Sequence, residues 1–269
     1  MKAYRWVRLD PTGNITALVL SPVPEPERAA VTAALLEESE QVGYLTAPED
    51  PACRAGLCMM GHEFCGNASM AAAAWLGRED GMLPGEERTL KLEVSGAKAP
   101  VRCDIRAPEE PSLPWIGTVE MPPVLEVQPA EAEGRFCVIV RMEGITHLIY
   151  PGRLPDRETA ERLLRDFARG RAETAVGLLQ WDEEHCFMTP LVYVRESGSM
   201  TWETGCGSGS TAVGAWKALL AGEGTSVLPV RQPGGCLKVG GTVKEGKVTR
   251  LTICGQVKMD GQGTRICQR

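Results

Sequence analysis

The segment CGNASMAAAAW, residues 65–75, recurs as CGSGSTAVGAW at residues 206–216, and this repeat is the strongest indication of the fold. Six of the eleven aligned positions are identical, and the copies lie about half the chain apart. In each copy Cys-Gly precedes a run of small residues, which predicts a helix buried on every face. One Ala-rich core helix would be ordinary. Two of them, each begun by Cys-Gly, favour an internal duplication.

Cys65 and Cys206 are the candidate catalytic residues. A helix N-terminus exposes backbone N–H groups and partial positive charge, lowers the pKa of a thiol and binds carboxylates. The neighbours that let backbone donors approach a ligand are Gly66, Asn67, Gly207 and Ser208. Two such helix ends could hold an α-carboxylate while one thiolate removes the α-proton and the other thiol protonates the opposite face. The pattern therefore predicts racemisation.

Composition narrows the class of protein. The 269 residues are 43% hydrophobic, which suits a globular core, and carry a net charge of −6 with a pI near 5.3. No basic stripe points to nucleic acid, and no apolar run is long enough to span a membrane. Residues 1–10 are too charged for a signal peptide. We expect a soluble cytoplasmic protein that acts on a small molecule.

The ten cysteines are expected to be free thiols, because a reducing compartment disfavours disulfides. There is no Cys-x-x-Cys pair, and the closest spacing is that of Cys53 and Cys58, so no metal site is expected. Seven cysteines outside the repeated motif are interpreted as small buried hydrophobes, since most of them sit in strand-like surroundings. The seven are Cys58, Cys103, Cys137, Cys186, Cys236, Cys254 and Cys267.

Both halves of the chain read as strand, helix, strands, helix, strands. Further helices are expected at residues 24–37 and 155–169, and separate short strands at 186–188, 191–194, 248–254 and 257–259. Residues 128–134 look like a linker. The expected domains are 1–128 and 129–256, with a strand in 257–269 that could return to the first domain.

Three other enzyme classes fit less well. A cysteine protease needs a histidine partner, and nothing near His62, His147 or His185 favours that family. The Gly-rich residues 205–210 lack the Gly-Lys-[Ser/Thr] ending of a phosphate loop. A thiol-disulfide oxidoreductase usually has its cysteines two apart. A disulfide between the two remote motif cysteines would be an inactivated state.

The motifs also resemble a known family. They are DPTGNIT (10–16), EQVGY (40–44), GHEFCGNA (61–68), WETGCGSG (202–209) and QPGG (232–235). In this order they resemble the diaminopimelate epimerase-like superfamily of cofactor-independent amino-acid racemases. Within it, the chain is most similar to histidine racemases of staphylopine-type (opine) metallophore biosynthesis.

The resemblance implies an α+β fold of two pseudo-symmetric domains, each a β-sheet barrel around a central helix, with the active site in the cleft between them. It implies that Cys65 and Cys206 are the acid/base pair and that neither pyridoxal phosphate nor another cofactor is used. A homodimer is compatible with it. The expected substrate-binding residues are Asn14, Glu40, Gly66, Asn67, His147, Glu203, Gly207 and Ser208.

A purely structural role is also open to three of these residues. Asn14 could simply form a turn, Glu40 a solvated helix end, and His147 a structural position in a strand. Diaminopimelate epimerases carry a Glu-Arg pair upstream of the second cysteine, which residues 195–203 lack, and this favours histidine over diaminopimelate. A diaminopimelate epimerase and a non-catalytic amino-acid-binding protein of the same fold remain the alternatives.

Overall fold

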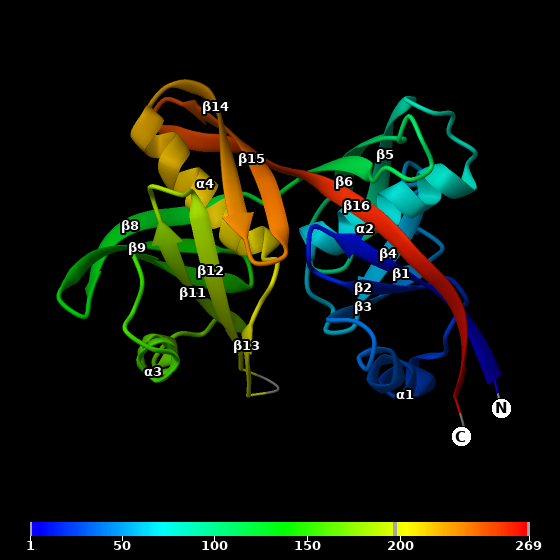
Figure 1. Cartoon of the computed structure of the whole chain (residues 1–269), viewed down its shortest axis with the longest axis horizontal. Helices are drawn as coiled ribbons and strands as arrows, with labels where there is room; N and C mark the ends of the chain where they lie inside the picture. The colour runs from blue at the N-terminus through cyan, green and yellow to red at the C-terminus, as the bar shows by residue number, and fades with distance from the viewer. Residues whose placement is uncertain (1, 196–197, 268–269) are drawn as a thin grey trace. The chain divides into compact units, whose positions relative to one another are not determined.

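A computed structural model describes residues 2–195 and 198–267 (Figure 1). The chain forms two compact units. Unit 1 contains residues 1–120 and 254–269, and unit 2 contains residues 121–253. The chain therefore passes from one unit to the other twice, and the C-terminal segment belongs to unit 1.

Unit 1 is built mainly of strands with two helices between them. Its elements are β1 (Lys2–Pro11), β2 (Thr16–Val19), α1 (Glu25–Leu35), β3 (Gln41–Thr46), β4 (Ala55–Met59), α2 (Gly66–Glu79), β5 (Glu87–Val94), β6 (Val101–Arg106) and β7 (Trp115–Glu120). The second part of the long strand β16 (Lys247–Cys267) pairs antiparallel with β1.

Unit 2 has the same kind of content. Its elements are β8 (Val124–Ala132), β9 (Arg135–Met142), β10 (Ile145–Pro151), α3 (Arg157–Ala168), β11 (Ala175–Asp182), β12 (Phe187–Val194), β13 (Ser199–Trp202), α4 (Gly207–Ala221), β14 (Gly224–Gln232) and β15 (Gly235–Lys244). The first part of β16 also belongs to it.

Each helix connects two strands that pair in parallel. In unit 1, α1 joins β2 to β3 and α2 joins β4 to β5. In unit 2, α3 joins β10 to β11, and β13 and α4 together connect β12 to β14. Parallel neighbours need such a crossover, because a tight hairpin can join only antiparallel strands. The architecture is mixed α+β and dominated by sheet, as the sequence predicted at this level.

The two Cys-led helices are buried, as predicted. Every residue of α2 from Gly66 to Gly77 is buried, and so are most residues in the first half of α4. α2 packs against β1, β2, β5, β6 and β7, and α4 against β8, β9, β10, β14 and β15. Small side chains allow strands to approach from several sides. In the part of the chain that the structure describes, no helix is long and apolar enough to cross a membrane.

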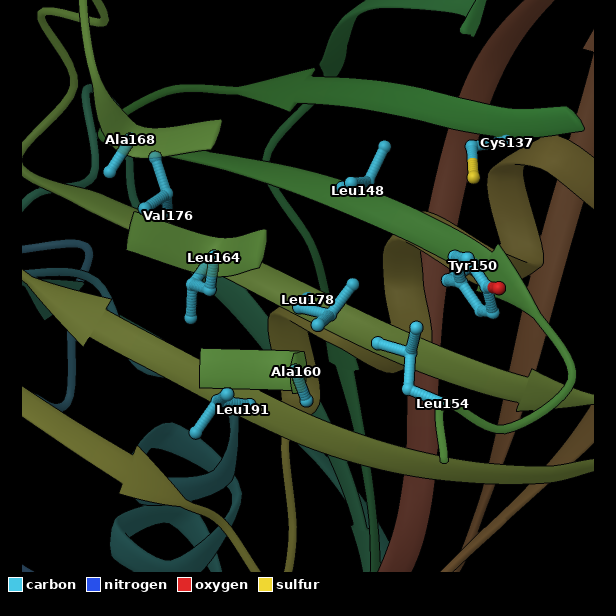
Figure 2. Packing of buried hydrophobic residues seen from close by; sticks show 10 residues of the cluster. All are labelled: Cys137, Leu148, Tyr150, Leu154, Ala160, Leu164, Ala168, Val176, Leu178 and Leu191. Atoms are coloured by element: carbon cyan, nitrogen blue, oxygen red, sulfur yellow. The ribbon is translucent and has the colours of Figure 1, made fainter. Parts of the chain in front are cut away.

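A separate core in unit 2 lies under α3, and Figure 2 shows its buried side chains. Ala160, Leu164 and Ala168 recur every fourth residue, so they share the face of α3 that meets the sheet. The strand residues of this core are Leu148 and Tyr150 of β10, Val176 and Leu178 of β11, and Leu191 of β12. Because side chains alternate along a strand, the His147 ring projects from the opposite face, beside Gly177. That face meets α4, which contacts β10.

Three local expectations were wrong. The expected linker at 128–134 lies in a hairpin, where β8 pairs antiparallel with β9 through residue 132. Among the strands that the structure describes, β8 pairs with β9 alone, so it tolerates Pro129 and exposed acidic residues as an edge strand does. The strands expected at 186–188 and 191–194 form one strand, β12, and those at 248–254 and 257–259 lie within β16. The domain boundaries at 128 and 256 stay a prediction.

Candidate active site

Cys65 caps α2 in unit 1. Its backbone is extended (φ −132°, ψ 111°), and its Sγ accepts a hydrogen bond from the Ala68 amide at 3.4 Å. The Cys65 carbonyl accepts from the Ser69 amide at 2.9 Å, which closes the first turn. The amides of Gly66 and Asn67 point out of the helix end, as first-turn amides do. The sulfur therefore lies among backbone donors that favour negative charge.

Gln41 is the side chain that faces the Cys65 thiol. The Thr16 hydroxyl donates to the Asn14 carbonyl at 3.0 Å, so its oxygen is available to accept from Gln41 Nε2 at 2.7 Å. This orients the amide so that Gln41 Oε1 accepts from the Cys65 S–H at 3.2 Å. Gln41 was not predicted as a functional residue, although it stands beside Glu40 in the motif at 40–44.

Three predicted binding residues adjoin this network in unit 1. Asn14 is half-buried and contributes its carbonyl to the Thr16 bond. Glu40 is exposed, and its amide donates to the Ile15 carbonyl at 2.9 Å, next to Gln41. Asn67 is buried in the first turn of α2. Backbone groups of Asn14 and Glu40 thus lie next to the Thr16–Gln41 hydrogen bonds, and Asn67 follows Cys65 in the first turn of α2.

Cys206 caps α4 in unit 2 in the same way. Its backbone is extended (φ −119°, ψ 106°), and its Sγ accepts from the Gly209 amide at 3.3 Å. Its carbonyl accepts from the Ser210 amide at 3.0 Å. The residue is only 4% exposed. The first-turn amides of Gly207 and Ser208 again point out of the helix end.

Gln232 fixes the backbone at Cys206. Its Oε1 accepts from the Cys206 amide at 2.6 Å, and its Nε2 donates to Ser210 Oγ at 2.9 Å. The Ser210 hydroxyl donates to the Cys206 carbonyl at 2.8 Å. This closed ring of hydrogen bonds holds the cysteine against its helix. Neither Gln232 nor Ser210 was predicted, although Gln232 begins the motif at 232–235 and Ser210 lies in the repeated segment.

The protonation state of Cys206 is set by its surroundings. Burial raises the pKa of the thiol well above its usual value, and the negative charge of Glu203 and a hydrogen bond from the thiol to that carboxylate raise it further. The Ser208 hydroxyl and the Gly209 amide lower this pKa, since both donate to a thiolate. The resting form is therefore a thiol that is hydrogen-bonded to the Glu203 carboxylate.

His147 lies behind Ser208. The ring is fully buried, with Nε2 3.0 Å from Ser208 Oγ, and Ser208 Oγ lies 3.5 Å from Cys206 Sγ. Burial lowers the pKa of His147 to about 3, so the ring is neutral at neutral pH. Within the described residues, the side-chain hydrogen bond of His147 toward Cys206 is the one to Ser208.

The chemistry available at both helix ends is that of thiols. The nine cysteines whose side chains the structure describes are free. Within residues 2–195 and 198–267, no group of His, Cys, Asp and Glu side chains could hold a metal ion. Each helix end thus combines a thiol, an adjacent side-chain acceptor for its S–H hydrogen bond and backbone donors for an anion. This is suited to proton transfer beside a carboxylate.

Proteins with related sequences are racemases. A histidine racemase from Staphylococcus aureus is 29% identical over 244 residues, which cover 86% of each chain. A histidine racemase from Fusobacterium nucleatum is 27% identical over 217 residues, which cover 78% of each chain.

Solved structures share the fold. The crystal structure of a probable proline racemase from Agrobacterium radiobacter K84 superposes with a TM-score of 0.72 at 15% identity, covering 99% of this chain and 93% of that chain. A hydroxyproline epimerase from Agrobacterium vitis gives a TM-score of 0.71 at 15% identity, covering 97% of this chain and 92% of that chain.

The sequence profile of one family decides the assignment. The profile described as "Histidine racemase CntK N-terminal domain" matches residues 3–265, which is nearly the whole chain. The chain therefore belongs to the histidine racemase CntK N-terminal domain family and is an enzyme of the racemase class.

Proposed function

We propose that this enzyme interconverts L- and D-histidine without pyridoxal phosphate, with Cys65 and Cys206 as its two acid/base groups. The observation that carries the proposal is the environment of the two cysteines. Each one caps a buried helix, accepts a backbone hydrogen bond at sulfur and donates its S–H to a side-chain hydrogen-bond acceptor. Two thiols placed in the same way suit a reaction that must run in both directions.

In the proposed reaction, the thiolate of one cysteine takes the α-proton as the C–H bond breaks. The electron pair passes into the carboxylate, which becomes enediolate-like, and the thiol of the other cysteine protonates the opposite face of the carbon. The first cysteine ends as the thiol and the second as the thiolate, so the reverse reaction exchanges their roles. The first-turn amides of Gly66, Asn67, Gly207 and Ser208 stabilise the charge on the carboxylate.

Glu203 has a specific part in this scheme. When Cys206 works as the base it must first lose its proton, and the carboxylate to which it is hydrogen-bonded accepts that proton. At the other helix end, the amide oxygen of Gln41 accepts a hydrogen bond from the Cys65 thiol. Asn14, Glu40 and Asn67 are proposed to bind polar groups of the substrate beside Cys65.

Histidine is proposed as the substrate because the curated relatives are histidine racemases, at 26–29% identity. The stretch before Cys206 lacks the Glu-Arg pair that would hold diaminopimelate. We further propose a role in opine-type metallophore biosynthesis, a cytoplasmic location, and an architecture of two duplicated domains, each a barrel around its Cys-led helix. A homodimer is the oligomeric state to test first.

Exchange of the α-proton in D₂O tests the reaction directly. With L-histidine, the D-histidine formed early is expected to carry deuterium at Cα, while the remaining L-histidine keeps its proton, because the two faces use different sulfurs. Chiral chromatography coupled to mass spectrometry measures both pools. Diaminopimelate in a parallel reaction serves as the comparison: turnover of diaminopimelate alone would contradict the histidine assignment, and binding of histidine without exchange would contradict the enzyme mechanism.

A further inference from the structure

His147 is a buried polar side chain that the proposed reaction leaves unused. It lies in β10, and Leu148 and Tyr150 of the same strand point into the core under α3. Alternation along the strand sends His147 to the other face, toward α4. A fully buried imidazole is costly unless its nitrogen atoms are hydrogen-bonded, so its partners indicate its role.

Only one of the two ring nitrogens has a partner within the described residues. Nε2 lies 3.0 Å from Ser208 Oγ, whereas Nδ1 is buried and makes no hydrogen bond in that part of the chain. Nδ1 faces Gly177, which pairs with His147 in the parallel register of β10 and β11. A Cβ added at Gly177 would lie 2.2 Å from Nδ1, so the ring occupies the space that a side chain would fill.

This packing determines which nitrogen carries the proton. The ring is neutral and has a single N–H. On Nδ1 that proton would be a buried donor without an acceptor, which proteins tolerate less well than an acceptor without a donor. On Nε2 it is donated to Ser208 Oγ. The tautomer with hydrogen on Nε2 is therefore favoured.

The direction of the next hydrogen bond follows. Ser208 Oγ accepts from His147, so its own hydrogen is free to point at Cys206 Sγ, 3.5 Å away. A hydroxyl that donates to sulfur stabilises the thiolate more than the thiol. We call the two hydrogen bonds from His147 to Ser208 and from Ser208 to Cys206 the relay. The relay opposes the effects of burial and of Glu203, which favour the thiol.

We propose that His147 is a positioning residue that acts through Ser208, fixing its hydroxyl as a hydrogen-bond donor to the Cys206 thiolate. The ring does not exchange protons with the substrate. The proposal rests on the proposed function for its catalytic meaning: the relay assists the stereochemical direction in which Cys206 is the base. The proposal also explains why position 177 is a glycine, because a side chain there would occupy the space of the His147 ring.

The test measures thiolate formation without any substrate. The pH dependence of Cys206 alkylation by iodoacetamide is followed by peptide mass spectrometry. The thiolate displaces iodide, and Cys65 in the same sample is the internal reference. The midpoint of this profile is the pH at which Cys206 is alkylated at half its maximal rate. Ser208→Ala and His147→Leu are each expected to raise this Cys206 midpoint by about one pH unit, the equivalent of one ordinary hydrogen bond. His147→Gln, which keeps a donor, should move it less.

A double variant decides whether histidine acts through serine. In the Ser208→Ala background, His147→Leu is expected to give no further shift, whereas additive shifts would overturn the relay. The exposed His185 provides the matched control, and His185→Gln should leave the Cys206 midpoint unchanged. If His147→Leu does not fold, the absence of a shift in Ser208→Ala alone is enough to overturn the proposal.

The same experiment separates the relay from the proposed function. A shift in Cys206 reactivity together with no racemisation of histidine would retain the relay and remove the racemase assignment. Racemisation of histidine with no shift in Cys206 reactivity would retain the racemase assignment and remove the relay. In an active enzyme, Ser208→Ala should slow one stereochemical direction more than the other in single-turnover reactions.

Discussion

The two cysteines have the same backbone role and different side-chain partners. Cys65 faces the neutral amide of Gln41, whereas Cys206 faces the carboxylate of Glu203 and the hydroxyl of Ser208. The charge of Glu203 favours the thiol form of Cys206. The two sulfurs therefore differ in these side-chain partners although both cap helices.

Replacing either sulfur tests the acid/base assignment. Cys65→Ser and Cys206→Ser are each expected to lower the racemisation rate by about 10²–10⁴-fold, because a serine hydroxyl is a much weaker acid than a thiol. Chiral chromatography of L- and D-histidine measures the loss. Cys236→Ser is the control, since that cysteine is exposed and lies outside the site. Full activity in either of the first two variants would contradict the two-base mechanism.

Glu203→Gln tests the origin of the raised pKa of Cys206. Burial remains, but the negative charge is removed, so the pKa of the thiol should fall and its alkylation by iodoacetamide should begin at lower pH. The catalytic rate should fall as well, because the carboxylate no longer accepts the proton. Glu184→Gln, an exposed change in the same unit, should alter neither property. An unchanged or higher midpoint in Glu203→Gln would refute the assigned effect of the carboxylate.

At the scale of elements, the first turns of α2 and α4 offer a matched pair. The third residue is Ala68 in α2 and Gly209 in α4. A Cβ at Gly209 would lie 2.8 Å from Leu179 and 3.1 Å from Cys206 Sγ. Alanine normally stabilises a helix by about 1 kcal/mol over glycine, but here its methyl group would press on the thiol.

Gly209→Ala is therefore expected to lower kcat, while Ala68→Gly should mainly cost about 1 kcal/mol of stability. Urea denaturation and steady-state racemisation measure the two effects. A Gly209→Ala variant that is both more stable and fully active would show that Leu179 and the thiol have room to move.

His147 in strand β10 makes the free energy of unfolding depend on pH. Its pKa is about 3 in the folded protein and about 6.5 unfolded, so the unfolded state binds the proton first as pH falls. The stability contributed by the neutral ring is complete above about pH 6.5 and is lost as pH falls toward 3, with an upper limit of about 5 kcal/mol. His147→Gln should flatten this decline in urea midpoints, and His185→Gln should not. Parallel declines in all three proteins would refute the prediction.

Strand β8 shows why a sequence pattern alone can mistake an edge strand for a linker. The residues of β8 read as a linker because Pro129 and the acidic residues around it are typical of loops. An edge strand that pairs only with β9 accepts the same residues. Composition cannot separate the two states, since the difference lies in whether a partner strand is present.

At the scale of the whole molecule, the two-base proposal requires both sulfurs to respond to one bound substrate. Saturating histidine is expected to protect Cys65 and Cys206 together from iodoacetamide, with equal half-maximal concentrations, while the exposed Cys236 continues to react. Peptide mass spectrometry reports all three sites in one sample. Protection of a single cysteine, or two different half-maximal concentrations, would contradict a shared substrate.

The reaction class, the two cysteines and the buried helices that they begin could all be predicted from the chain alone. Each of these depends on local chemistry: a thiol beside first-turn amides, followed by residues small enough to be covered on all sides. Asn67, Ser208 and Glu203 could be placed near the cysteines for the same reason, because they are close to them in the sequence.

The side chains that complete the two thiol environments could be found only in the folded protein. Gln41 reaches Cys65 from β3, Gln232 reaches the Cys206 amide from β14, and His147 reaches Ser208 from β10. None of these pairings has a fixed spacing in the chain, since strand pairing and helix packing bring the residues together. Gly177 is the clearest case: its missing side chain matters only because the parallel register places it beside the His147 ring.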